Sequence, residues 1–334
     1  TKPSWMSHPG YATMPIEVGE EFTIEQLLNL MLIPSGNTPA NILAEYIAGS
    51  VDSFAAMMNT KAHELGCTNS HFTNPYGLHD EDHYSTASDL AIIARTAMQN
   101  EIFRSIVSKT SYSLPATNKY DKDDRVYTTT NELIVPNNTN RADNYYYKNA
   151  IGVKTGFTSY AKDCLVGAAA RDGLEFICVI LGGEETSSGL SERFLDARTL
   201  LDYGFDHYNI RKLKAKNDIV KDIEVKNATR NTKNLTLVVE DEINVLINKD
   251  DNEKIILPEI KLKEDLKAPI QEGEVVGTIE YVVEGISYET NLLASSEVKK
   301  SSFFLTILQI LLIIFILIVI SKFVKRKKRK NRRK

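Results

Sequence analysis

The stretch VKTGFTSYAKDCLVGAAARDGLEFICVIL, residues 153–181, decides the fold of this chain because Asp172-Gly173 separates two apolar runs in it. An Asp-Gly pair between two such runs is a strong signal for a β-hairpin. The first run begins with Lys154-Thr155-Gly156, which places that tripeptide at the start of a hairpin strand. We therefore predict an antiparallel sheet centred on these residues.

Amphipathic helical patterns flank this hairpin on both sides. The predicted helices cover residues 23–33, 39–48, 52–65, 86–99 and 191–203. The first of them opens with a Thr23/Gln26 capping box, and Thr86 is the expected cap of the fourth. Thr38 as N-cap, Pro39 at the first helical position and Gly49 after the last turn are typical of helix boundaries. Gly204 is expected to end the last helix. Residues 108–147 are polar, and their pattern favours no assignment.

The pattern divides the chain into four parts. Helices around an antiparallel sheet predict an α/β domain over residues 1–207. Residues 208–298 show short β-type segments, including 235–239, 243–247 and 278–283, and Glu284-Gly285 is a plausible hairpin turn, so a small all-β domain is expected. Residues 303–320 and 321–334 form an apolar segment and a basic tail.

The apolar segment predicts a membrane anchor. Of the 18 residues from 303 to 320, only Thr306 and Gln309 are polar. At about 1.5 Å per residue such a helix spans roughly 27 Å, close to the hydrocarbon core of a bilayer. Ten Lys or Arg residues follow it, which predicts a single-pass protein of the cell membrane with a cytoplasmic tail and an extracytoplasmic body. That topology requires an export signal upstream of the body. Because no such signal is visible from Thr1 onward, we expect the chain to begin downstream of a missing segment.

Composition excludes several classes of partner and cofactor. Residues 1–321 carry 30 bases against 44 acids, which argues against a nucleic-acid partner. Cys67, Cys164 and Cys178 are too scattered for a disulfide framework or a zinc site and are interpreted as small core residues. The segment His79 to His83 is acidic but is interpreted as a solvated loop, so no metal and no cofactor are predicted.

Two short motifs carry the chemistry. Ser35-Gly36-Asn37 lies in a loop between two predicted helices, and Lys154-Thr155-Gly156 opens the hairpin strand. Either tripeptide alone is a weak signal, and an isolated Ser-Gly-Asn is most often an ordinary turn. In this order and on these elements, they resemble the second and third motifs of the penicillin-recognising serine acyltransferases.

The wider sequence resembles the D-alanyl-D-alanine carboxypeptidase family over about residues 10–300. The matching segments are Leu-Leu at 27–28, Ile-Pro-Ser-Gly-Asn at 33–37, Leu-Ala-Glu-Tyr-Ile-Ala-Gly at 43–49, Met-Asn at 58–59, Asn-Pro-Tyr-Gly-Leu at 74–78, His-Tyr-Ser-Thr-Ala at 83–87, Leu-Leu-Asp-Tyr-Gly-Phe at 200–205, Ala-Pro-Ile at 268–270 and Gly273 to Gly277. The resemblance implies a transpeptidase domain of the penicillin-binding-protein and β-lactamase type, then the family's C-terminal β-domain.

The resemblance also implies that the protein acts in peptidoglycan biosynthesis and so affects the cell wall and the shape of the cell. In this family a serine attacks the penultimate D-Ala carbonyl of the stem peptide, terminal D-Ala leaves, and water hydrolyses the acyl-enzyme. Such a serine needs an adjacent lysine as base, because an unactivated hydroxyl is a poor nucleophile. Peptidoglycan stem peptides and β-lactam antibiotics are therefore the expected partners, together with the lipid bilayer.

The family's Ser-x-x-Lys motif, which supplies that serine and lysine, does not occur in residues 1–34. Two later matches, Ser159 to Lys162 and Ser296 to Lys299, are interpreted as chance occurrences. We expect the nucleophile upstream of Thr1.

The roles of the remaining motif residues follow from the resemblance. Ser35 would relay a proton toward the leaving amine, and Asn37 would bind the substrate amide. Lys154 would place a fixed positive charge beside the Ser-Lys pair and attract the substrate's carboxylate. The substrate-binding residues are expected to be Thr155, Gly156, Phe157 with its backbone N–H in the oxyanion hole, and Arg193.

Three alternatives stay open. Arg193 falls where the family has a carboxylate-binding arginine, but it could be a helix-surface residue in a salt bridge. Tyr145 to Tyr147 could line the substrate groove or pack in the core. The whole chain could be a pseudoenzyme that binds peptidoglycan, or a β-lactamase, although the β-domain, the anchor and the lack of an evident deacylating Glu disfavour the latter.

Overall fold

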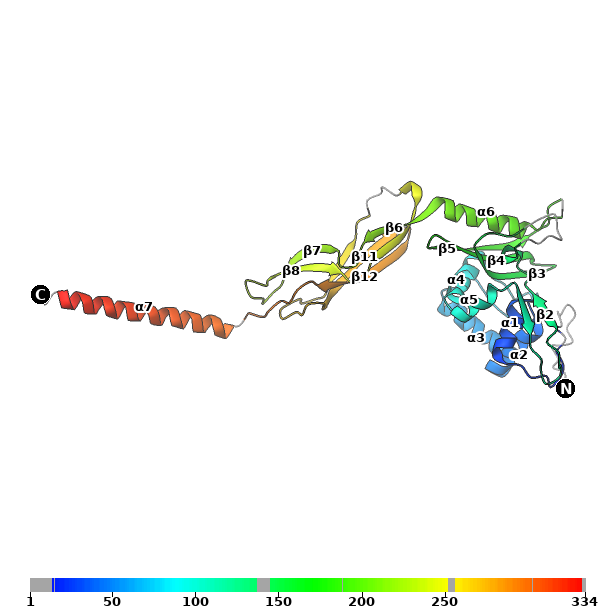
Figure 1. Ribbon diagram of the computed structural model, residues 1–334, viewed down its shortest axis with the longest axis horizontal. Helices are drawn as coiled ribbons and strands as arrows, with labels where there is room; N and C mark the ends of the chain where they lie inside the picture. Colours follow the sequence, from blue (N-terminus) through cyan, green and yellow to red (C-terminus); the bar gives the residue numbers. More distant parts are fainter. Residues whose placement is uncertain are drawn as a thin grey trace. The chain divides into compact units, whose positions relative to one another are not determined.

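The computed structural model describes residues 14, 16–136, 145–187, 189–251, 256–301 and 303–331. The chain forms two compact units, residues 1–207 and residues 208–334 (Figure 1).

The first unit is an α/β domain. Its helices are α1 (Ile24–Leu32), α2 (Asn37–Ala48), α3 (Val51–Glu64), α4 (Ala87–Met98), α5 (Glu101–Val107) and α6 (Glu192–His207). Its strands are β1 (Ser111–Leu114), β2 (Arg125–Thr128), β3 (Ala150–Thr158), β4 (Lys162–Arg171) and β5 (Leu174–Gly183). The last three form an antiparallel sheet in the order β3-β4-β5. Asp172 and Gly173 both have positive φ, 53° and 79°, between β4 and β5, which confirms the predicted hairpin.

The sheet is covered by helices on both faces, and the side chains of its central strand point alternately to one face and to the other. Leu165 and Ala169 of β4 belong to a core cluster with Phe194 and Leu201 of α6. Ala168 instead packs with Met98 and Val107, from α4 and α5 (Figure 1). Successive strand residues point to opposite faces, so one strand serves two cores. The unit therefore has three layers, with the sheet in the middle.

Local signals located most helix ends correctly. Thr23 and Gln26 form the predicted capping box of α1, and Thr86 caps α4. Thr38 is not the N-cap of α2, however, because Gly36 is, and Thr38 lies inside the helix. Gly204 does not end α6, which continues to His207.

Tertiary contacts explain both corrections. The Gly36 N–H donates to the carbonyl of Leu30 at 3.0 Å, so the chain folds back tightly and α2 begins immediately afterwards. Gly204 lies against Phe176, whose ring atoms would be 3.0 to 3.2 Å from a Cβ at that position. Gly204 therefore leaves room for the aromatic ring of Phe176 and does not end the helix.

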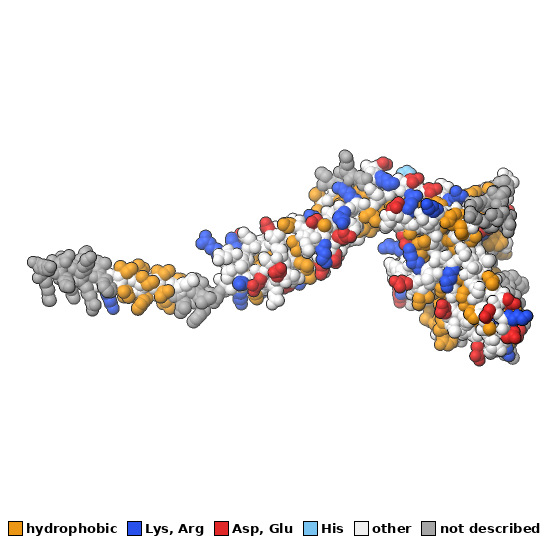
Figure 2. All heavy atoms as spheres, in the orientation of Figure 1, with side chains coloured by type: hydrophobic (Ala, Val, Ile, Leu, Met, Phe, Trp, Pro, Cys, Tyr) orange, Lys and Arg blue, Asp and Glu red, His pale blue; other side chains and the backbone are white. Residues whose placement is uncertain are grey.

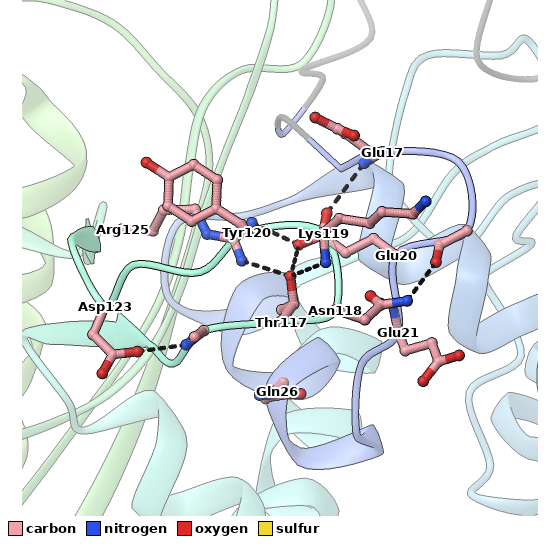
Figure 3. Close-up of polar contacts among 12 residues, drawn as sticks. Glu17, Glu20, Glu21, Gln26, Thr117, Asn118, Lys119, Tyr120, Asp123 and Arg125 are labelled. Atoms are coloured by element: carbon pink, nitrogen blue, oxygen red, sulfur yellow. Dashed lines mark hydrogen bonds and ion pairs between the residues drawn. The ribbon is translucent and has the colours of Figure 1, made fainter.

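The unassigned polar region contains the β1–β2 hairpin, which is fastened to the segment before α1 (Figure 3). Glu20 accepts hydrogen bonds from the Thr117 hydroxyl at 2.6 Å and from Arg125 Nη1 at 2.8 Å. The Glu20 side chain is 1% exposed and that of Arg125 11%. Burial raises the pKa of Glu20, but these hydrogen bonds, one from the Glu17 backbone and the charge of Arg125 outweigh it, so the pKa lies below the ordinary 4.5.

The second unit is a β-domain, followed by a helix. Its strands are β6 (Tyr208–Lys214), β7 (Ile219–Glu224), β8 (Asn234–Val239), β9 (Ile243–Asn248), β10 (Glu259–Leu262), β11 (Val275–Val283) and β12 (Ile286–Ala294). They form a five-stranded sheet in the order β10-β11-β12-β8-β7 and a β6-β9 pair. The predicted turn is confirmed, since Glu284 and Gly285 have φ of 50° and 80° between β11 and β12.

Helix α7 (Phe303–Asn331) follows the β-domain and includes the predicted apolar segment. Within the part of the chain that the structure describes, no helix reaches the length and apolar character needed to cross a bilayer. The membrane span at residues 303–320 therefore stays a prediction.

We expect the substitution Glu20→Gln to lower the free energy of unfolding by roughly 3 kcal/mol at pH 7, because it leaves Arg125 as a buried charge without a counter-ion. The matched control is Glu64→Gln, since Glu64 pairs with Lys61 at 3.0 Å but both side chains are more than half exposed. It should cost less than about 0.5 kcal/mol.

Urea denaturation of both variants measures the difference. Because the folded-state pKa of Glu20 is lowered, its ionised form stabilises the fold above about pH 4.5, and this advantage over Glu20→Gln should shrink as the pH falls further. Equal losses in the two variants would contradict the proposed importance of burial.

Candidate active site

The two predicted motifs meet in space. Lys154 Nζ donates a hydrogen bond to Ser35 Oγ at 2.7 Å, although the two residues are 119 positions apart in the sequence. The same ammonium group donates to the carbonyl of Thr155 at 2.9 Å. The loop between α1 and α2 therefore lies against β3, and a hydroxyl and an amine are in direct contact.

Backbone geometry holds Ser35 in this position. Its φ of 64° is in the left-handed region, which is unfavourable for a residue with a side chain. The next residue, Gly36, has no space for a Cβ, which would be 2.8 Å from the carbonyl oxygen of Leu30 and 2.4 Å from Met14 Sδ. The Ser-Gly pair is thus needed to fold the loop tightly and direct the hydroxyl at Lys154.

Lys154 has an unusual electrostatic environment. Burial, and to a smaller extent the positive charge of Arg193, lower its pKa from 10.5 to about 8. The predicted positive charge is therefore present at neutral pH but is lost as the pH rises through about 8.

Thr155 lies beside the lysine and is 9% exposed. Its hydroxyl is hydrogen-bonded to the hydroxyl of Thr130. Sequence reasoning missed Thr130 because it lies in the polar region where no pattern favoured an assignment. A contact of this kind between distant hydroxyls has no sequence signal.

Arg193, near the start of α6, points to the same strand. Its Nη1 is 3.2 Å from the carbonyl of Gly156 and 3.1 Å from Asp163 Oδ1. The alternative for Arg193 was a helix-surface residue in a salt bridge. The salt bridge is present, but the Arg193 side chain is only 17% exposed and therefore does not lie on the helix surface. Asp163 was also missed by sequence reasoning.

The other predicted residues lie on the same two elements. Asn37 is the first residue of α2, and Phe157 is on β3 and is 70% exposed. Their roles in binding stay predictions. Tyr145 and Tyr147 are buried in the core, where the hydroxyl of Tyr145 accepts a hydrogen bond from the Ser191 backbone at 2.8 Å. Core packing is therefore the role that the structure gives these two tyrosines.

A cleft of 610 Å³ continues from the end of β3. It is lined by residues of the segment 73–80 and by residues 157–160. The rings of His79 and Tyr160 stack with centroids 3.8 Å apart. Among the described residues there is no group of three or more His, Cys, Asp or Glu side chains arranged to hold a metal ion.

Comparison with known proteins adds the following findings. Residues 2–185 match the family described as D-alanyl-D-alanine carboxypeptidase, and residues 208–300 match the penicillin-binding protein 5 C-terminal domain. The chain is 34% identical to D-alanyl-D-alanine carboxypeptidase DacF of Bacillus subtilis over 88% of this chain and 70% of that protein. For DacB2 of Mycobacterium tuberculosis the identity is 36%, over 57% of this chain and 60% of that protein. Penicillin binding protein 5 of Haemophilus influenzae has a similar structure, with a TM-score of 0.64, 26% identity, and coverage of 87% of this chain and 79% of that one.

We expect Gly36→Ala to destabilise the first unit by about 1–3 kcal/mol, because the new methyl group meets a backbone oxygen at 2.8 Å and the loop must shift. The matched control is Gly156→Ala, whose Cβ would meet Cys164 Cβ at 3.7 Å, an ordinary contact. Thermal unfolding of the two variants compares them. Equal stability of the variants would show that the loop tolerates a side chain.

We expect Lys154 to titrate near pH 8, which ¹³Cε NMR of lysine-labelled protein can measure. The variant Arg193→Gln should move this titration to higher pH, because one positive charge that lowers the pKa is removed. A titration near 10.5, or one that is unchanged in the variant, would contradict this electrostatic assignment.

Proposed function

We propose that this chain, which belongs to the D-alanyl-D-alanine carboxypeptidase family, is part of a serine-type carboxypeptidase that hydrolyses the terminal D-Ala from peptidoglycan stem pentapeptides. The reaction passes through a serine acyl-enzyme. A β-lactam acylates the same serine, because its strained amide takes the place of the peptide bond.

The observation that carries the proposal is the hydrogen bond between Lys154 Nζ and Ser35 Oγ. A buried lysine whose pKa is near 8 exchanges protons at physiological pH, and a hydroxyl in direct contact can pass a proton on. This pair is suited to moving a proton toward a leaving amine.

Each motif residue has a role in this scheme. Ser35 relays the proton, and Asn37 at the start of α2 binds the substrate amide. Lys154 attracts the terminal carboxylate while it is protonated, and Thr155 hydrogen-bonds it. Gly156 lets the substrate approach β3 closely, and Phe157 contributes its backbone N–H to the oxyanion hole. Arg193 binds the carboxylate from the side of α6.

The nucleophile and its base are assigned to a Ser-x-x-Lys motif upstream of Thr1, so that residues 1–207 form part of the catalytic domain. The two matches within the chain are poorly suited to the task. Ser159 and Lys162 lie at the turn between β3 and β4, and Ser296 and Lys299 follow β12 in the second unit. A Ser-x-x-Lys pair acts from successive turns of a helix, which neither pair occupies.

The site of action is assigned to the outer face of the cell membrane. Residues 303–320 would cross the bilayer once, residues 208–298 would separate the catalytic domain from it, and the basic tail from residue 321 would stay in the cytoplasm. The uninterrupted apolar sequence and the ten basic residues that follow it support this topology.

Labelling with a fluorescent penicillin tests the proposal. The product of the reading frame extended upstream of Thr1 should label covalently, and its Lys154→Met variant should label at least about 100-fold more slowly, because the loss of a preorganised charge costs roughly 3 kcal/mol in such sites. The 334-residue chain should not label. Failure of the extended product to label would favour a peptidoglycan-binding pseudoenzyme instead.

A further inference from the structure

Asp163 is a carboxylate at the active site that the scheme above does not use. It lies on the central strand β4, opposite Phe157 of β3. Its side chain is 14% exposed, so the charge is largely withdrawn from water. A buried carboxylate is costly unless both of its oxygen atoms are satisfied.

Both oxygen atoms of Asp163 have a partner. Oδ1 is 3.1 Å from Nη1 of Arg193, and Oδ2 accepts a hydrogen bond of 2.5 Å from the hydroxyl of Ser191. Ser191 is itself fixed, since its backbone N–H donates to the hydroxyl of Tyr145 at 2.8 Å. The carboxylate therefore has one defined orientation between α6 and the sheet.

Arg193 is held on two sides but keeps an unused donor. Its Nη1 contacts both Asp163 and the carbonyl of Gly156. Its Nε is buried and has no hydrogen-bond partner among the described residues. A buried N–H without a partner is costly, so the position of this guanidinium is set by its contacts with Asp163 and Gly156.

We propose that Asp163 is a positioning residue, which holds the guanidinium of Arg193 against β3 in the orientation that binds the terminal carboxylate of the D-Ala-D-Ala substrate. This inference rests on the proposed function. Asp163 does not touch the substrate, and it acts through Arg193. It also balances one of the two positive charges, Lys154 and Arg193, that the site brings together in the absence of substrate.

The alternative, that Asp163 is merely a structural ion pair, makes a different prediction about substrates. A structural pair would affect every substrate equally. A positioning residue affects only substrates that carry the carboxylate which Arg193 binds, since a guanidinium fixed in advance loses little entropy on binding.

The first experiment compares two peptides in the full-length product, one ending in D-Ala-D-Ala with a free carboxylate and one with a terminal carboxamide. Asp163→Asn should lower kcat/KM for the free acid about tenfold, mainly through KM, and change the value for the carboxamide less than twofold. Ser191→Ala should give a smaller loss of the same kind. Asp172→Asn, in the exposed β4–β5 turn, is the control and should change neither.

Three outcomes would overturn the proposal. Equal losses for both peptides would make Asp163 structural, and no loss for either would show that Arg193 is held without it. A lower KM for the free acid would show that Asp163 competes with the substrate for Arg193.

A second measurement needs no turnover and uses the 334-residue chain in detergent micelles. The Nε–H of Arg193, assigned by its absence in Arg193→Gln, should exchange with solvent about tenfold faster in Asp163→Asn and at an unchanged rate in Asp172→Asn. Unchanged exchange in Asp163→Asn would overturn the positioning role even if the full-length product proves inactive. Inactivity of the full-length product together with faster exchange would instead refute the proposed function alone.

Discussion

The buried ammonium group of Lys154 is the constraint on which the candidate site depends. A charged group withdrawn from water needs acceptors close by, and it finds them in the hydroxyl of Ser35 and the carbonyl of Thr155. The first of these contacts requires the α1–α2 loop to lie against β3. One hydrogen bond thus joins the helical layer to the edge strand of the sheet and brings the two motifs together.

The same constraint sets the charge balance of the site. Burial and the positive charge of Arg193 together lower the pKa of Lys154 to about 8. Asp163 offsets this concentration of positive charge from the far side of Arg193. An anionic substrate would complete the balance, in keeping with the proposed binding of a terminal carboxylate.

The three-layer packing supports the site from both faces of the sheet. Helix α6 provides Arg193 and Ser191 lies just before it, while the helices of the opposite face carry the Ser35 loop. Strand β4 connects the two cores because Leu165 and Ala168 point in opposite directions. A change in either core can therefore shift a functional side chain without touching it directly.

The sequence by itself determined the features that depend on neighbouring residues. The Thr23–Gln26 capping box, the Asp172-Gly173 and Glu284-Gly285 turns and the two tripeptide motifs were all predicted, because caps, turns and motifs are read from residues a few positions apart. Only the tertiary structure decided that Gly204 accommodates Phe176, that Glu20 holds Arg125, and that Thr130 and Asp163 line the site. These contacts join residues that are distant in the sequence. They form because a buried polar group needs a hydrogen-bond partner, and because two closely packed elements need side chains that fit each other, and both conditions are met only in the folded chain.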